Sequence, residues 1–212
     1  TALTASGSVH SWGDDDHGAD SSSMDAISDI VQVWGGGAGF VAERRSGGLE
    51  AWGYAKLEKD RDELLETCDL DSWDGVGVDT MLIIDKAAAV HFNNTGGVCM
   101  WGSATDGGSV SVSLAVRLSE DVLTLVGGDG TYMAQKSDMV YMWGYPNPDL
   151  DATTDDASLP EDLTDNLELD PANAVAGSMF GTYMIESVAG MLHFGFNVDN
   201  WFTAVGYDDV VE

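Results

Sequence analysis

The chain has 212 residues and a mass of 22.4 kDa, enough for one domain or one short array of repeats with its own core. It carries 37 Asp and Glu residues against 8 Lys and Arg residues, so its formal net charge of −29 argues against binding to nucleic acid or to an anionic membrane surface. Because 44% of the residues are hydrophobic and no apolar run has the length of a membrane span, we expect a folded chain that does not insert into a membrane.

The acidic residues are mainly aspartates: 27 Asp and 10 Glu stand against 4 Lys and 4 Arg. A surface of short carboxylates with few lysines stays hydrated in concentrated salt, where charge repulsion is screened over a few ångströms. The composition therefore predicts a protein from a salt-rich setting. An acidic protein from ordinary conditions that binds divalent cations is the alternative.

Along the chain, five short segments read as strands that end in an aromatic residue followed by glycine. The intervals between the aromatic residues are 40, 49, 42 and 51 residues, and the residues are Trp12, Trp52, Trp101, Trp143 and Phe194. A pair of shorter apolar segments precedes each of the last four, at 30–42, 81–92, 123–134 and 174–185, and glycine separates the two segments in every copy except the looser one at 81–92. Each unit therefore reads as strand, turn, strand, turn, strand, which is the pattern of an antiparallel meander.

A repeat of about 40 to 50 residues with three or four strands is typical of a β-propeller blade, because one meander cannot bury both of its faces alone. The sequence from Ile30 to Gly53, with valines and a double glycine in one strand and a later strand that ends in Trp-Gly, resembles the regulator-of-chromosome-condensation propeller family. The stretch from Ala2 to Gly13 resembles the second half of the same repeat. The resemblance implies an all-β propeller. The exchange-factor activity of the founding family is not carried over, because nothing in this acidic chain indicates a basic chromatin-facing surface.

We predict one propeller domain over residues 1–212, with about five blades of four strands or fewer. Residues 1–4 read as the second half of a blade and residues 201–207 as its first half, so the N- and C-terminal strands are expected to share one blade. A piece of a longer propeller is the alternative. Two loop insertions are expected, at 54–80 with an amphipathic helix over 56–67, and at 145–171 with a helical turn near 161–167.

The five recurring aromatic residues are expected to pack between blades, since they hold equivalent positions. Trp73 lies outside that register in an acidic stretch, and we interpret it as an exposed anchor for an interaction. No nucleophile motif is found, and His10, His91 and His193 read as packing residues of strands, so no catalytic or cofactor-binding residue is predicted. Cys68 and Cys99 either form a disulfide or remain two buried thiols.

One acidic segment comes near the pattern of a calcium loop. In the stretch from Asp69 to Gly75, the residues Asp69, Asp71 and Asp74 could supply carboxylates to Ca²⁺ or another hard cation. The third aspartate comes one residue late, however, and no glutamate follows at the required distance. A solvated acidic loop is the alternative, and it is also the alternative to a metal site at His17, which follows three aspartates.

These observations favour a non-enzymatic propeller that acts as a binding or structural module. We expect an extracellular surface of a halophilic system, such as the decoration, turret or fibre of a virion or a cell envelope, with a protein or like subunits as partners. Two alternatives remain: a propeller that inhibits a secreted enzyme, and a glycan-active enzyme with paired carboxylates in an axial pocket. Perturbed carboxylates gathered in one cavity would indicate the enzyme, whereas a contact patch would indicate the binding module.

Overall fold

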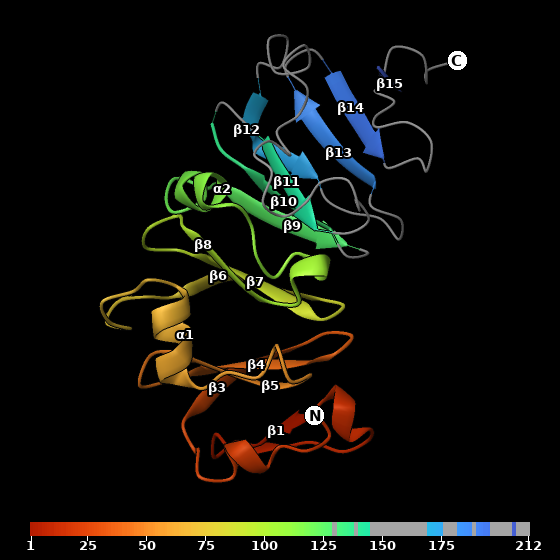
Figure 1. The fold of residues 1–212 in the computed structure, drawn as a ribbon. Coiled ribbons are helices and arrows are strands. Elements are labelled where there is room, and N and C mark those ends of the chain that lie inside the picture. The colour runs from red at the N-terminus through yellow and green to blue at the C-terminus, as the bar shows by residue number, and fades with distance from the viewer. Residues whose placement is uncertain are drawn as a thin grey trace.

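The computed structural model describes residues 1–128, 131–137, 140–144, 169–175, 182–187, 190–195 and 205–206. The described strands form small antiparallel sheets that follow one another along the chain and stack in sequence order (Figure 1). The all-β prediction is confirmed. No helix in this described part is long and apolar enough to cross a membrane.

Each sheet is a meander in which neighbouring strands pair antiparallel. The sheets are β1-β2, β3-β4-β5, β6-β7-β8, β9-β10-β11 and β12-β13-β14-β15. The strands are β1 (Ala2–Leu3), β2 (Val9–His10), β3 (Ile30–Gly35), β4 (Gly39–Arg44), β5 (Leu49–Gly53), β6 (Val78–Ile84), β7 (Ala87–Phe92), β8 (Val98–Gly102), β9 (Thr124–Gly128), β10 (Thr131–Gln135), β11 (Val140–Gly144), β12 (Leu169–Val175), β13 (Thr182–Ser187), β14 (Gly190–Gly195) and β15 (Val205–Gly206).

The middle strand of the sheet β6-β7-β8 is buried on both faces because a neighbouring sheet covers each face. All six residues of β7 are buried, and they alternate between two cores. Ala88 and Val90 face the core shared with β3-β4-β5, whereas Ala87 and Ala89 face the core shared with β9-β10-β11. This alternation follows from the two-residue period of a strand, and the small alanines let the sheets approach each other.

The sheets come together along their first strands, since β3 contacts β6 and β6 contacts β9. The double glycines lie at this approach: an added Cβ at Gly36 would overlap Ile83 of the next sheet, and one at Gly127 would lie 2.5 Å from Ile84 Cδ1. The repeated glycine pair is therefore explained by close contact between sheets.

Two helices fill the wider space between the outer edges of the sheets. Helix α1 (Arg61–Thr67) contacts β5 and β8 and inserts the fully buried Leu64 into the core between those sheets. Helix α2 (Val112–Arg117) is followed by Leu118, which is fully buried in the next core. The predicted helix over 56–67 begins at Arg61 instead, because the Asp60 carboxylate caps it by accepting from the N–H groups of Asp62 and Glu63.

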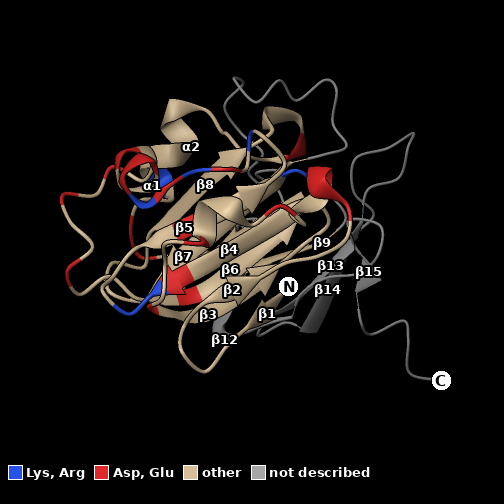
Figure 2. Cartoon of the chain, turned by 90° about the horizontal axis from the view of Figure 1, so that it is seen from below, with Lys and Arg blue, Asp and Glu red and all other residues tan. Residues whose placement is uncertain are grey.

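The described part of the chain also holds three short 3₁₀ segments in its connections, η1 (Asp15–His17), η2 (Ser22–Met24) and η3 (Ala104–Asp106). The charged residues of the described part lie mainly in such connections and at strand ends, and the strands carry few of them (Figure 2). The expected helical turn near 161–167, and most of the expected insertion at 145–171, lie outside the described residues.

The expectation that the terminal strands share one blade is wrong. Strand β1 pairs with β2, whereas β15 pairs with β14 through Leu192 opposite Gly206 and His193 opposite Val205. The two strands lie at opposite ends of the stack (Figure 1). Pairing β15 with the strand that precedes it closes a short loop, which loses less chain entropy than closing the whole chain on itself.

Candidate interaction surface

A groove runs between α1 and α2 on the side of the stack where both helices lie (Figure 1). Its volume is about 1160 Å³, and all five residues of β8 line it. The segment before α1, α1 itself and α2 form the walls. The wall residues include Lys56, Lys59, Cys68, Val112 and Val116. The floor of the groove is therefore the edge strand of the sheet β6-β7-β8.

The outer edge of β8 presents backbone groups toward this groove. The N–H of Ser103, directly after β8, donates to the O of Lys86, directly before β7, at 2.8 Å. Because backbone direction alternates along a strand, the odd-numbered residues of β8 also point their N–H and C=O groups toward β7. Val98 has the opposite parity, and its N–H donates away from β7 to Leu118 O at 2.7 Å. By the same alternation the N–H and C=O of Met100, which lies between them, point into the groove.

The equivalent edge of the preceding sheet is already occupied by the chain itself. Ala51 stands one residue before Trp52, as Met100 stands one residue before Trp101. Ala51 N–H donates to Lys59 O at 2.9 Å, and Lys59 N–H donates to Ala51 O at 3.0 Å, which makes an antiparallel bridge. The fold thus accepts one more extended segment at this position, and in β8 that position opens into the groove.

The walls of the groove combine a covalent link with exposed apolar side chains. A disulfide joins Cys68, directly after α1, to Cys99 of β8, so the first of the two predicted alternatives for these cysteines is confirmed. On the other wall, Val112 and Val116 stand four residues apart on α2 and are 82% and 67% exposed. Such a pair on one helical face offers an apolar contact that no described residue covers.

Trp73 is not the exposed anchor that we predicted, because only 4% of it is exposed. Its ring meets Phe92 edge to face at 6.3 Å, and its indole N–H donates to Arg61 O at 3.2 Å. Trp73 is therefore a core residue that fastens the loop after α1 to the sheet. The acidic neighbours of Trp73 in sequence gave no sign of these contacts, which come from other parts of the chain.

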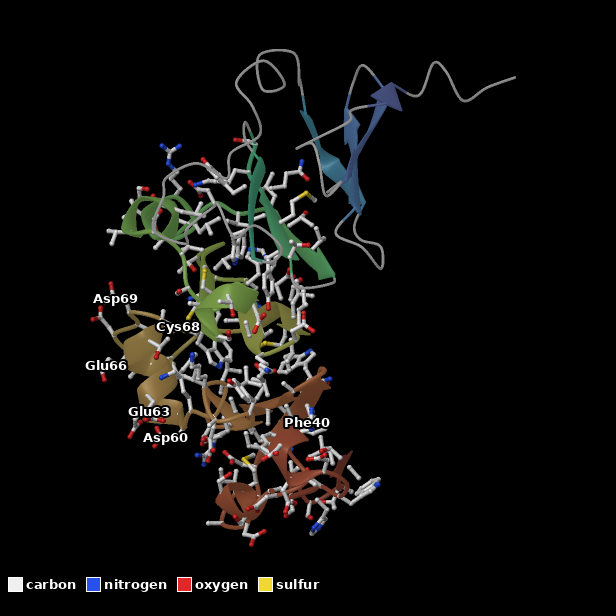
Figure 3. The ribbon with its side chains drawn as sticks, turned by 45° about the vertical axis from the view of Figure 1, so that its right-hand side comes forward. Phe40, Asp60, Glu63, Glu66, Cys68 and Asp69 are labelled. Carbon is white, nitrogen blue, oxygen red and sulfur yellow. A yellow bond between two sulfur atoms is a disulfide. The ribbon has the colours of Figure 1, made fainter. Side chains whose placement is uncertain are left out.

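The three aspartates predicted as cation ligands are not gathered around one point. No group of three or more His, Cys, Asp or Glu side chains able to hold a metal ion occurs within the described ranges, which include Asp69, Asp71 and Asp74. Asp69 has a left-handed backbone with φ of 52°, and its N–H donates to Glu66 O, so it terminates α1. Its side chain lies with Asp60, Glu63 and Glu66 on the outer side of the helix (Figure 3).

Three of the five recurring aromatic residues pack as predicted. Trp52, Trp101 and Trp143 are buried. The side chains of Phe194 and His193 lie outside the residues whose burial is described, whereas the prediction for Trp12 is wrong because it is 70% exposed. His91 is a packing residue, since its ring nitrogens lie 3.1 Å from Asp79 Oδ2 and 2.8 Å from Val122 O.

Among the described residues, the two carboxylates with raised pKa values, Glu43 and Glu50, do not form a pair. Burial raises the pKa of Glu50, although its ion pair with Arg44, at 3.0 Å, and an N–H from Arg61 oppose that effect. Burial also raises the pKa of Glu43. Glu43 of β4 pairs with Leu49 of β5, and paired residues project from the same face of the sheet. Glu50 follows Leu49 in β5, so its carboxyl group lies on the opposite face from that of Glu43. The arrangement lacks the paired geometry that glycoside hydrolysis requires.

Of the groove residues, Met100, Val112 and Val116 were not singled out from the sequence. The alternation of serine and valine from Ser109 to Val112 is typical of a strand and obscures the short helix that begins at Val112. The spacing of Val112 and Val116 is the signal that could have revealed an apolar helical face. The open edge at Met100 carries no signal in the sequence, because it depends on where the following segment runs.

No family model matches the sequence, and no curated protein matches it either. Among solved structures, the chain is similar to yeast RCC1 (Prp20), crystallised bound to Kap60, with a TM-score of 0.52 and 15% identity over 81% of this chain and 44% of that one. It is also similar to the CRINKLY WD40 ectodomain of the Arabidopsis thaliana receptor kinase ACR4, with a TM-score of 0.48 and 16% identity over 84% of this chain and 56% of that one. Human WBSCR16 matches with a TM-score of 0.46 and 15% identity over 82% of this chain and 50% of that one.

The likeness to yeast RCC1 concerns the fold, and it confirms the predicted resemblance to RCC1-like propellers at that level. The chain spans about half the length of the three proteins that it matches.

Proposed function

We propose that this chain, whose fold is that of an RCC1-like β-propeller, is a non-catalytic module that binds an extended segment of a partner protein along the open edge of β8. The observation that carries the proposal is the bridge between Ala51 and Lys59 in the preceding sheet. In that sheet, the segment at Lys59 pairs with the outer edge of β5. The equivalent edge of β8 is open and faces the groove. The yeast propeller with this fold was crystallised with a protein partner, Kap60, which is consistent with a protein ligand.

The bound segment would add a strand to β8 by pairing its backbone with the N–H and C=O of Met100. Main-chain hydrogen bonds supply affinity in such strand addition, and side-chain pockets supply specificity. Val112 and Val116 would contact an apolar side chain of the segment, since both are exposed on the groove wall. Lys56 and Lys59 line the opposite wall together with Glu58, Glu63 and Asp69, so that wall offers partners for either sign of charge.

We further propose an extracellular setting in a salt-rich system, such as a virion decoration, turret or fibre protein or a cell-envelope protein. The charge of −29 supports the salt-rich setting. The disulfide between Cys68 and Cys99 supports an oxidising compartment, because disulfides persist mainly outside the cytosol. Inhibition of a secreted enzyme would be one special case of segment binding.

A display library of random peptides, selected at molar salt, tests the strand addition. Selected peptides should bind the wild-type chain and lose at least about tenfold in affinity with Met100→Pro, which removes the outward N–H but no hydrogen bond to β7. Met100→Leu keeps that N–H and is the matched control. The amide of Met100 should also exchange its hydrogen more slowly when the peptide is bound.

A second variant pair guards against misfolding of the proline variant. Val112→Asp with Val116→Asp should weaken the same peptides, whereas Val31→Asp, at an exposed valine of β3, should not. Peptides that bind all of these variants equally, with no protection of the Met100 amide, would rule out strand addition at β8.

A further inference from the structure

One exposed turn carries a sequence motif that strand addition at β8 does not use. Residues 93–95 read Asn-Asn-Thr, which fits the pattern Asn-x-Ser/Thr of acceptors for N-linked glycans in exported proteins. None of the other six asparagines in the chain is followed two residues later by serine or threonine. The motif is short, so it identifies a site only where the fold exposes it and where the chain reaches the cell exterior.

The motif lies in the turn between β7 and β8, and all three of its residues are exposed. The N–H of Gly96 donates to Phe92 O at 2.9 Å and closes the turn. Neighbouring loops hold the turn from both sides, because Asn93 N–H donates to Gly77 O at 3.0 Å and Val122 N–H donates to Gly96 O at 2.8 Å. The backbone of the hairpin therefore keeps the motif at the surface.

The side-chain amide of Asn93 makes no hydrogen bond to any described residue. It lies over Gly77, where an added Cβ would come within 2.6 Å of Asn93 Nδ2. The preceding sheet has a carboxylate at the equivalent place. There Asp29 O accepts from Arg45 N–H at 2.7 Å, as Gly77 O accepts from Asn93 N–H, and the Asp29 carboxylate binds the hydroxyl of Ser46 at 2.6 Å. With glycine in that place, the exposed amide of Asn93 can turn outward without breaking a hydrogen bond.

The same hairpin carries the chain's indication of export. Cys99 lies in β8, the strand that follows the motif, and it forms the disulfide with Cys68. Disulfides persist mainly outside the cytosol, and N-linked glycans belong to exported proteins. The disulfide and the motif therefore indicate the same kind of compartment by independent chemistry.

We propose that Asn93 carries an N-linked glycan when the chain is exported. The inference rests on the extracellular setting proposed above and not on peptide binding at β8. In this modification, Asn93 Nδ2 forms a bond to the anomeric carbon of an oligosaccharide carried on a lipid phosphate, and the bond between that carbon and the phosphate oxygen breaks. The amide nitrogen gives up one proton and the lipid phosphate leaves, so the transfer needs no oxidant or reductant.

Export of the full chain with a secretion signal, from a haloarchaeal host that glycosylates its own exported proteins, tests the proposal. The mass of the processed chain should exceed 22.4 kDa by one oligosaccharide, and the tryptic peptide 87–117 should carry it on Asn93. Asn93→Gln and Thr95→Ala should each remove the added mass, because each destroys the motif. Asn94→Gln changes the same turn but preserves the motif, so it is the matched control and should keep the added mass.

The same chain expressed without the signal should stay in the cytosol and have its bare mass. An exported chain without the added mass would overturn the proposal whether or not its disulfide has formed, because an unfolded chain exposes the motif at least as well. A glycan on another residue, or one attached in the cytosol, would overturn it too. The host supplies the export and no peptide is present, so a negative result would leave peptide binding at β8 unaffected.

Discussion

Each tryptophan that ends a sheet is followed by a glycine with a backbone conformation that other residues adopt only under strain. The φ angles are 122° at Gly53, 112° at Gly102 and 111° at Gly144. At Gly102 the neighbouring strand also leaves no room for a side chain, because an added Cβ would lie 2.5 Å from Lys86 O and 2.7 Å from Ala87 Cα. The Trp-Gly pair in the sequence therefore reflects both a backbone conformation and a close approach of two strands.

Substitutions at two of these glycines separate the two effects. Gly13→Ala should cost about 1 to 2 kcal/mol of the free energy of unfolding, since it introduces backbone strain into open space. Gly102→Ala should cost at least about 2 kcal/mol more, because the methyl group also overlaps the backbone of β7. Denaturant unfolding in molar salt measures both. Equal losses would show that the strand contact contributes nothing.

The raised pKa of Glu43 predicts a stability change whose sign depends on pH. Burial of its side chain raises the pKa of Glu43 above 4.5, which favours the protonated form in the folded state. The folded state then binds a proton more readily than the unfolded state, so stability falls as the pH rises from about 4.5 through the raised value. Glu43→Gln keeps an acceptor and removes the charge, so it should stabilise the protein at pH 7 by a few tenths of a kcal/mol, because partial exposure screens the effect.

Unfolding curves of wild type and Glu43→Gln at pH 4 and pH 7 measure this difference. The two proteins should be equally stable at the acidic pH and differ at the neutral one. Glu58→Gln, which removes one carboxylate from an exposed residue, is the matched control. A stabilisation that is larger at pH 4 would contradict the assignment.

At the residue scale, the sequence reveals recurrence but not burial. Trp52, Trp101 and Trp143 could be predicted as core because they recur with glycine at regular intervals. Trp12 shares the same motif and is 70% exposed, so the motif alone does not determine burial. The opposite error was made for Trp73, which was predicted to be exposed and is buried. Its contacts come from Arg61 and Phe92, which lie 12 and 19 residues away in the sequence.

At the scale of single elements, α1 shows how a short helix becomes stable in this fold. It has only seven residues, too few to persist alone, but the carboxylates of Asp60 and Glu63 form a capping box at its start. The buried Leu64 anchors it to the core, and the disulfide from Cys68 ties its end to β8. The amphipathic pattern predicted the helix correctly and placed its start five residues early, because a cap is a more local signal than a hydrophobic period.

Removal of the disulfide should destabilise the protein without changing its fold. The bond closes a loop of 31 residues, so Cys68→Ser with Cys99→Ser should cost about 3 to 4 kcal/mol according to chain-entropy arguments. Reduction of the wild-type chain should produce the same loss. Denaturant unfolding with and without reductant measures it, and the double variant is the control because it should not respond to reductant. If reductant also destabilised the variant, the loss of stability would not come from the bond between Cys68 and Cys99.

At the scale of the whole molecule, the repeat could be predicted and its closure could not. The order of strands within each meander follows from sequence periodicity, glycine turns and the need to bury two faces, and the sheets form accordingly. Whether the terminal strands pair is one long-range contact, and it depends on the angle by which each sheet is rotated relative to the sheet before it. That angle depends on the sizes of side chains between sheets, such as Ala87 to Ala89, and the repeat pattern does not contain it.

The net charge of −29 predicts that the folded chain depends on salt. Acidic side chains cluster on small parts of the surface, for example Asp60, Glu63, Glu66 and Asp69 along the outer side of α1 (Figure 3). At about 0.01 M salt the Debye length is about 30 Å, so charges across the whole molecule repel one another, whereas at 1 M it is about 3 Å. Unfolding separates these charges, so low salt should favour the unfolded state. We expect the midpoint of thermal unfolding to fall by about 10 °C between 1 M and 0.01 M KCl, as for a loss of about 3 to 4 kcal/mol.

Circular dichroism during heating, at a series of KCl concentrations, measures this dependence. Glu66→Gln with Asp69→Asn removes two exposed charges of the α1 cluster and should lower the salt concentration needed for half of the maximal stabilisation. Arg45→Lys, which preserves the charge of an exposed residue, should leave that concentration unchanged and is the matched control. A chain that is most stable at 0.01 M KCl would show that charge repulsion does not limit its stability, and the abundance of aspartate would then need a cause other than adaptation to salt.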